Sequence, residues 1–288
     1  MIKNNKYLIK ISASGNKFLV ADYRWFDAKL MDFLPPYSCL IEQPFKNFEE
    51  LSQKSQEERS FFLKEIFSLK EFKDSDGLIV FKDSKNLIPH YDFYNKDGSM
   101  PEMCGNASCC LIDYGRKTNL NFENFQLGQF SIKAMKNFQG DWSISLSKNS
   151  IVKSSLFFSY KGKEYPYSFV VSGVPHAVLE WESDFQKEDL KPLAQAMRYN
   201  KKFQEEGMNV SYYKIEKDNY LKGITFERGV EDFTLACGTG ALSIATAFVR
   251  SSKGRHFKEV FIDMPGGQLI VDLRGDSPLL KSSVKWGY

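Results

Sequence analysis

The sequence lacks the patterns that mark several common classes of protein. It contains no C-x-x-C pair, and His90, His176 and His256 have no ligand spacing to one another, so no metal site is expected. No apolar run approaches the roughly 18–20 residues of a membrane span. The net charge is only +3 and the basic residues are scattered, which does not fit a nucleic-acid-binding surface. We therefore expect a protein that binds neither metal, membrane nor nucleic acid.

Cysteine is also scarce. The five cysteines are an odd number, and the N-terminal residues show no signal-peptide core, so we expect reduced thiols in a cytoplasmic protein. Cysteines that neither pair nor bind metal either fill the core or carry chemistry. Their positions are Cys39, Cys104, Cys109, Cys110 and Cys237.

Apolar patterning predicts a mixture of strands and helices. The chain has 288 residues, enough for one large domain or for two of about 140 residues each. Short or alternating apolar runs predict strands, and helical spacing predicts helices at 57–69, after Gly105, at 187–197 and at 238–250. We expect the strands at 7–11, 18–22, 78–81, 91–94, 130–135, 142–146, 169–171, 177–181, 210–214, 223–226, 260–263 and 268–273. The stretch 35–73 is interpreted as a surface insertion.

Two parts of the sequence repeat the same order of elements. A strand ends at Asn95, and nine residues later Cys104-Gly105 opens a helix. A second strand ends at Glu227, and ten residues later Cys237-Gly238 opens another. Such duplication predicts two similar α/β lobes, with a ligand site in the cleft between them.

A cysteine at the start of a helix is suited to acid/base chemistry. The unpaired N–H groups of the first turn and the helix dipole favour the thiolate and also hold a carboxylate. The glycine after each cysteine lets a ligand approach the backbone. With one such cysteine on each side of an amino acid, one thiolate could remove the Cα proton while the other thiol protonates the opposite face. The helix ends would stabilise the deprotonated Cα, and no cofactor would be needed.

A single cysteine before a helix is more often a small packed residue. The matching Cys-Gly pairs at Cys104 and Cys237 favour chemistry, whereas Cys39, Cys109 and Cys110 are interpreted as packing residues.

Eight short motifs resemble those of the diaminopimelate epimerase family, which belongs to the pyridoxal-phosphate-independent amino-acid racemases. They follow the family's order over nearly the whole chain. In order, they are Ser14-Gly15-Asn16-Lys17-Phe18 with Asp22, Asp76-Gly77-Leu78, Asn95-Lys96-Asp97-Gly98-Ser99 with Glu102-Met103-Cys104-Gly105-Asn106, Gly173-Val174-Pro175-His176, Met208-Asn209-Val210, Glu227-Arg228-Gly229, Leu235-Ala236-Cys237-Gly238-Thr239-Gly240 and Gly266-Gly267 before Leu269.

The resemblance implies an α/β (α+β) fold of two pseudo-symmetric lobes, each a curved mixed or antiparallel sheet around a central helix. It implies an isomerase without a cofactor that converts LL- to meso-diaminopimelate in lysine and peptidoglycan precursor synthesis. Cys104 and Cys237 would be the acid/base pair. The implied substrate-binding residues are Asn16, Asn95, Gly105, Asn106, Asn209, Glu227, Arg228, Gly238 and Thr239.

Several positions depart from the family's pattern. Val174 replaces an asparagine that would bind the distal end of diaminopimelate, and the segment from Arg228 to Cys237 is one residue longer than usual. Asn106-Ala107-Ser108-Cys109-Cys110 lacks a glycine and an arginine. The departures leave open a racemase for another amino acid, such as histidine.

Two further alternatives are an isomerase or hydrolase that uses other acids and bases, and a non-catalytic module that binds an amino acid. The retained cysteine pair argues against both. We expect an N-terminal lobe over 1–132, a C-terminal lobe over 133–275, and a return of 276–288 to the first lobe. A homodimer, and a disulfide between the two thiols in the absence of substrate, are left open.

Overall fold

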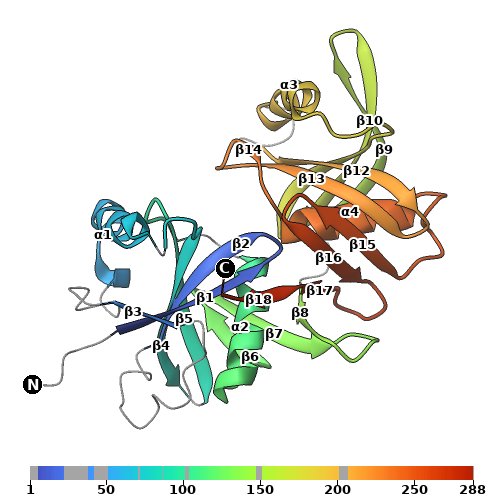
Figure 1. Cartoon of the computed structure of the whole chain (residues 1–288). Helices are drawn as coiled ribbons and strands as arrows, with labels where there is room; N and C mark the ends of the chain where they lie inside the picture. The colour runs from blue at the N-terminus through green and yellow to red at the C-terminus, as the bar shows by residue number, and fades with distance from the viewer. Residues whose placement is uncertain are drawn as a thin grey trace, which may run out of the picture. The chain divides into compact units, whose positions relative to one another are not determined.

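The computed structural model describes residues 6–22, 38–41, 51–70, 72–85, 87–100, 104–146, 151–200 and 207–287. It has the expected mixed α/β fold and divides into two compact units (Figure 1). The first unit is Met1–Ala134 with Val284–Tyr288, and the second is Met135–Ser283. No helix in these described ranges is long and apolar enough to span a membrane.

The first unit is a mixed sheet with helices on both faces. Its strands are β1 (Lys6–Ala13), β2 (Asn16–Ala21), β3 (Ser38–Ile41), β4 (Gly77–Lys85), β5 (Ile88–Asn95), β6 (Asn124–Leu127), most of β7 (Phe130–Lys136) and β18 (Val284–Trp286). They pair in the order β1-β2-β4-β5-β6-β7, with β2–β4 and β5–β6 parallel and the other pairs antiparallel. β3 and β18 both pair with β1. The helices are η3 (Leu51–Gln53), α1 (Gln56–Ser68) and α2 (Gly105–Thr118).

The second unit is built in the same way. Its strands are β8 (Trp142–Ser145), β9 (Ile151–Tyr160), β10 (Lys163–Ser172), β11 (Val174–Glu180), β12 (Asn209–Lys217), β13 (Tyr220–Glu227), β14 (Asp232–Phe233), β15 (Glu259–Met264), β16 (Gly267–Asp272) and β17 (Leu279–Ser282). They pair in the order β9-β10-β11-β12-β13-β15-β16-β17-β8, with β11–β12 and β13–β15 parallel. The helices are α3 (Lys187–Arg198) and α4 (Gly238–Arg250).

The two pairing orders match element by element. The first unit has the order β1-β2-β4-β5-β6-β7, which corresponds to β10-β11-β12-β13-β15-β16 in the second unit. The parallel pairs are the second and the fourth in each order. The helices α2 and α4 both follow the fourth of these strands. The segment between β2 and β4 contains α1, and the segment between β11 and β12 contains α3. The interpretation of 35–73 as an insertion is therefore wrong for its helix, since α1 is the counterpart of α3.

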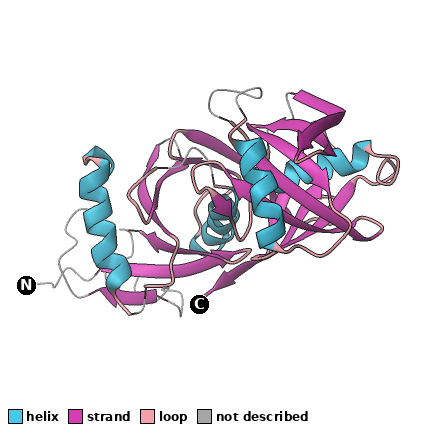
Figure 2. Ribbon diagram, turned by 90° about the horizontal axis from the view of Figure 1, so that it is seen from above, coloured by secondary structure: helices cyan, strands magenta, loops and turns pink. Residues whose placement is uncertain are grey.

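α1 packs against one face of the first sheet. Its buried side chains Leu63, Ile66 and Phe67 form a cluster with Leu8, Leu19, Leu78, Val80 and Tyr94 of the strands. Because successive strand residues point to opposite faces, Ile9, Val20 and Ile79 face the other side, and all three are buried. α2 contacts β1 and β18. In Figure 2 the strands of the first unit curve around a helix.

In the second unit α3 and α4 likewise pack against opposite faces of the sheet. Leu190, Leu193 and Met197 of α3 pack with Val210, Tyr212 and Phe226 of the sheet. α4 contacts β9, β10, β11, β12, β13, β15 and β16, so it is the central helix of this unit. Its sequence, rich in alanine and small residues, suits a helix with strands on many sides.

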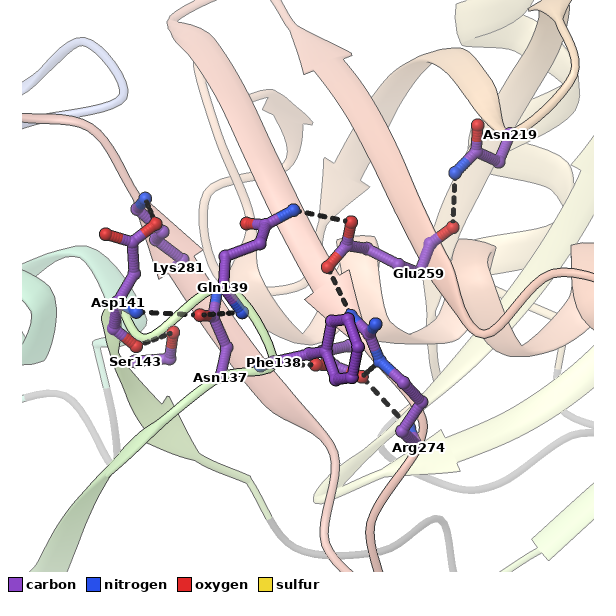
Figure 3. A network of polar contacts seen from close by, with 10 residues as sticks. Asn137, Phe138, Gln139, Asp141, Ser143, Asn219, Glu259, Arg274 and Lys281 are labelled. Carbon is purple, nitrogen blue, oxygen red and sulfur yellow. Dashed lines mark hydrogen bonds and ion pairs between the residues drawn. The ribbon is translucent and has the colours of Figure 1, made fainter.

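A polar network ties the turn before β8 to the last strands of the second unit (Figure 3). Glu259 accepts hydrogen bonds from Gln139 Nε2 (2.9 Å) and Arg274 Nη2 (2.5 Å), while Asp272 accepts from Arg274 Nε (2.8 Å). Lys281 pairs with Asp141. Each charged group in this network pairs with a group of opposite charge, so the network anchors the turn.

The end of the chain returns to the first unit, where β18 pairs with β1 through Ile11 and Trp286. β17, just before it, pairs with β16 and β8 and belongs to the second unit. The crossing back lies at Ser283–Val284, so residues 276–283 lie in the second unit and not, as expected, in the first.

Candidate active site

Cys104 and Cys237 are the N-cap residues of α2 and α4. Their backbones are nearly identical, with φ −128° and ψ 105° at Cys104 and φ −128° and ψ 115° at Cys237. Each sulfur accepts a hydrogen bond from the N–H three residues on, Ala107 N at 3.4 Å and Gly240 N at 3.3 Å. Each thiol therefore occupies the position where a helix offers its unpaired N–H groups.

The residues expected to hold a carboxylate lie in the first turns of these helices. Gly105 and Asn106 follow Cys104, and Gly238 and Thr239 follow Cys237. A helix start carries partial positive charge, so either turn is suited to bind an anion.

In the first unit Asn16 and Asn106 join β2 to the start of α2. Asn106 Nδ2 donates to Asn16 Oδ1 at 2.6 Å. The Oδ1 atom of Asn106 is buried and has no hydrogen-bond partner within the described residues. An unpartnered buried amide oxygen is costly, which is typical of a group that meets a ligand.

Asn95 lies at the end of β5, in a turn closed by its own side chain. Asn95 N donates to the Ser99 carbonyl (2.9 Å), and Asn95 Nδ2 donates to Ser99 Oγ (3.0 Å). Ser99 in turn donates through N and Oγ to Asp97. The turn therefore holds the amide of Asn95 in a defined orientation. Glu102 and Met103, between this turn and Cys104, lie outside the described residues.

In the second unit Glu227 lies against the Cys237 thiol. The carboxylate accepts a hydrogen bond from Thr234 Oγ1, and its charge acts on the Cys237 thiol. Burial raises the pKa of Glu227, and burial together with the charge of Glu227 raises the pKa of Cys237 well above its usual value. Hydrogen bonds from Thr239 and Gly240 only partly offset this. The expectation that the helix end lowers the pKa of both cysteines is thus wrong for Cys237, which is a thiol at neutral pH.

Behind Cys237 lies a buried polar chain that the sequence did not reveal as part of the site. Thr239 Oγ1 lies 3.4 Å from Cys237 Sγ and 3.1 Å from His176 Nε2. His176 Nδ1 lies 3.1 Å from Ser211 Oγ, which contacts Thr225. Burial, and then the charge of Arg228, lower the pKa of His176 to about 3, so the ring is neutral.

The hydrogen-bond partners of His176 define its tautomer. Asn209 Nδ2 can only donate, and it lies 3.2 Å from His176 Nε2, so Nε2 accepts and Nδ1 carries the proton. The motif Gly173-Val174-Pro175-His176 was a signal for this residue, but its partners lie up to 63 positions away in the sequence.

Asn209 also joins the strand ends that carry the other expected residues. Its Oδ1 accepts from Arg228 N at 2.7 Å, so the ends of β12 and β13 are held together beside Glu227. The structure thus brings Asn209, Glu227, Arg228, Thr239 and Cys237 together in the second unit. In the first it groups Asn16 and Asn106 with the start of α2.

Other singled-out residues are placed as follows. Cys109 and Cys110 are buried within α2, as expected for packing residues, and burial raises the pKa of Cys110. Val174 is half-buried at the start of β11, after Gly173 with φ +80°. The side chain of Cys39 lies outside the described part of the chain.

Solved structures with this architecture define the class of fold. A PhzF-family phenazine biosynthesis protein from Bacillus anthracis superposes with a TM-score of 0.62 at 10% identity, covering 99% of this chain and 97% of the other. A hydroxyproline epimerase from Agrobacterium vitis superposes with a TM-score of 0.57 at 14% identity, covering 99% and 90%. The fold is the one found in PhzF proteins and in amino-acid racemases and epimerases.

Sequence comparison narrows the class to a family. The sequence model of diaminopimelate epimerase matches residues 168–286. The diaminopimelate epimerase of Aquifex aeolicus is 32% identical over 241 residues, which are 82% of this chain and 78% of that protein. That of Campylobacter jejuni is 37% identical over 187 residues, 64% of this chain and 70% of that protein. The chain belongs to the diaminopimelate epimerase family.

Proposed function

We propose that this protein is a diaminopimelate epimerase that interconverts LL- and meso-diaminopimelate with Cys104 and Cys237 as its acid/base pair. The observation that carries the proposal is the matched geometry of the two thiols. Both cap a helix with the same backbone conformation, and both accept the N–H of the third helical residue. A packing role would not require this geometry twice.

The proposed reaction moves one proton off Cα and another onto it. One cysteine, as thiolate, takes the Cα proton, so the Cα–H bond breaks and an S–H bond forms. The other cysteine gives its S–H proton to the opposite face of Cα. The N–H groups at the helix starts, at Gly105, Asn106, Gly238 and Thr239, hold the carboxylate and stabilise the added negative charge. No step needs a cofactor.

The distal end of the substrate carries a carboxylate and an ammonium group. Arg228 offers a fork suited to the carboxylate, and the carboxylate of Glu227 is suited to the ammonium. Asn16, Asn95 and Asn209 supply amides that complete the recognition. The proposed place of action is the cytoplasm, where the thiols stay reduced.

Val174 supports a second candidate. An asparagine at this position would offer the distal group an amide, whereas valine offers none. A racemase for a different amino acid, such as histidine, would use the same two thiols without that amide.

Incubation with LL-diaminopimelate, followed by chiral chromatography, tests the proposal. We expect conversion to the meso isomer, and loss of conversion in Cys104→Ser and Cys237→Ser with the fold intact. A panel of single-enantiomer amino acids in the same assay separates the candidates. Racemisation of another amino acid without conversion of diaminopimelate would assign the second function.

A further inference from the structure

Two turns carry the proposed substrate-binding side chains, and they occupy equivalent places in the two units. In the first unit the turn at 95–99 follows β5 and precedes α2. In the second, the turn at 227–231 follows β13 and precedes α4. Each turn begins at the last residue of a strand, and the second turn joins the paired strands β13 and β14. The residues within each turn are also held by side chains from a neighbouring helix.

The turn in the second unit has a strained residue at its end. Glu231 N donates to the Glu227 carbonyl at 2.8 Å, which closes the turn. Glu231 has φ +58°, a region that costs energy for any residue with a Cβ. Its carboxylate folds back and accepts from Gly229 N at 3.1 Å. A glycine would adopt this backbone at a lower cost in energy. We therefore expect the contacts of the Glu231 side chain to offset that cost.

Two residues at the end of α3 bind the Glu231 carboxylate. Arg198 donates to Glu231 Oε1 through Nε (3.1 Å) and Nη2 (2.7 Å), and Tyr199 Oη donates to Oε2 (2.6 Å). The side chains of Arg198 and Glu231 are 12% and 34% exposed, so this ion pair is partly shielded from water.

Arg198 touches the neighbouring strand end as well. A Cβ on Gly207 would collide with the guanidinium and with the carbonyl of Arg198. Gly207 lies two residues before Asn209, whose amide oxygen accepts a hydrogen bond from Arg228 N. Arg198 therefore contacts both segments from which Asn209 and Arg228 project.

In the first unit an arginine of α1 also contacts the turn, although it lies near the start of its helix and binds a backbone carbonyl. Arg59 Nε donates to the Gly98 carbonyl at 2.7 Å, and Arg59 Nη1 donates to the Lys54 carbonyl at 2.6 Å. A Cβ on Gly98 would collide with the backbone of Gln56 and Ser60, so the turn lies directly on α1. α1 and α3 are counterparts, and each sends one arginine to the turn that precedes a cysteine-capped helix.

We infer that Arg198 and Arg59 are positioning residues that fix the two turns in the conformation needed for substrate recognition. The inference rests on the proposed function, because it takes Asn95, Glu227 and Arg228 to bind substrate. The apolar side of each helix packs separately, through Leu63 and Ile66 of α1 and Leu190 and Leu193 of α3. Loss of an arginine should therefore disturb binding before it disturbs the fold.

Steady-state kinetics with LL-diaminopimelate tests the inference. Arg198→Met removes the donors but keeps much of the apolar stem. We expect KM to rise about tenfold or more, the effect of weakening one hydrogen bond to a charged group, with a smaller change in kcat. Glu231→Gly relieves the strained backbone, yet we expect the same rise. The rise in the double variant should be smaller than the two single effects combined, because both changes break the ion pair of Arg198 with Glu231. Arg59→Met should raise KM in the same way.

Lys191→Met is the matched control. Lys191 also lies on α3 and pairs with Asp232 of the same segment at 3.0 Å, but both side chains are well exposed (38% and 55%). Its KM should stay at the wild-type value. Thermal unfolding of every variant identifies any that has lost its fold, and Arg198→Lys then replaces Arg198→Met. A wild-type KM in folded arginine variants would overturn the inference alone. An inactive wild-type protein would overturn the proposed function, and the inference with it.

Discussion

Cys104 in the first unit and Cys237 in the second cap equivalent helices with almost the same backbone, but their surroundings differ. Cys104 is half-buried, and the nearby amides are neutral. Cys237 is buried against the carboxylate of Glu227, with Thr239 and neutral His176 behind it. The comparison shows that the two units share the scaffold that places the thiols, whereas the groups around the two thiols differ. The protonation of Cys237 is therefore set by burial and by its side-chain neighbours and not by the helix end alone.

The largest expected effect comes from removing either thiol. Cys104→Ser and Cys237→Ser should each lower the rate of epimerisation about a thousandfold or more, because a serine hydroxyl is too weak an acid to be a poised base near neutral pH. Chiral chromatography measures the rate, and circular dichroism checks the fold. A variant of one cysteine that kept full activity would show that the two units do not share the chemistry.

Glu227→Gln tests why the two thiols differ. The variant removes the charge that helps to raise the pKa of Cys237, so we expect that pKa to fall and the thiolate to form at lower pH. Turnover should drop ~10- to 100-fold, since a hydrogen bond to a charged group is lost. The pH dependence of iodoacetamide alkylation, measured in a Cys104→Ser background, reports the pKa. If the pKa of Cys237 did not fall in this variant, the charge of Glu227 would not be a cause of its raised pKa.

His176 gives the second unit a dependence of stability on pH. Its folded pKa of about 3 lies below the unfolded value of 6.5, so the unfolded state binds the proton first as the pH falls. Stability from this group is complete above about pH 6.5 and is lost below it. Between pH 7 and pH 5 the free energy of unfolding should fall by ~2 kcal/mol from this residue. Urea titrations at several pH values give the free energy of unfolding of the wild type and of His176→Gln as a function of pH. An equal dependence on pH in the two proteins would refute this assignment.

The smallest expected effect concerns Val174. If the site binds diaminopimelate without the amide that the family's asparagine offers, Val174→Asn should lower KM about tenfold. Val174→Thr, which is similar in volume to valine but has no amide, is the control. A higher KM in the asparagine variant would favour a substrate without a polar distal group.

Much of the fold could be predicted from sequence because the local signals were strong. The helix at 238–250 was predicted with the bounds that α4 has, since the apolar run and the Cys-Gly start define both ends. β9 was missed: Lys153, Ser154 and Ser155 interrupt its apolar pattern, and Ser155 has φ +58°. The counterpart relation of α1 and α3 was missed as well, because their sequences share no motif and only strand pairing reveals it.

The candidate site was predictable only in part. Cys104, Cys237 and the residues beside them follow from short motifs. The contacts of Glu227 with Cys237, and of Arg198 with Glu231, join residues that no local pattern connects. Burial by distant strands also reversed the expected direction of the Cys237 pKa, and that burial cannot be read from the neighbouring sequence.

The central claim is that two thiols, one from each unit, act on the two faces of one Cα. The most direct measurement is the incorporation of deuterium when LL-diaminopimelate is converted in D₂O, analysed by mass spectrometry at low conversion. The account predicts deuterium at Cα in the meso product and protium in the recovered LL substrate, because the thiol that delivers the proton exchanges with solvent while the other holds the substrate's own. Product that retains the substrate's protium would contradict it, since a single base would then serve both faces.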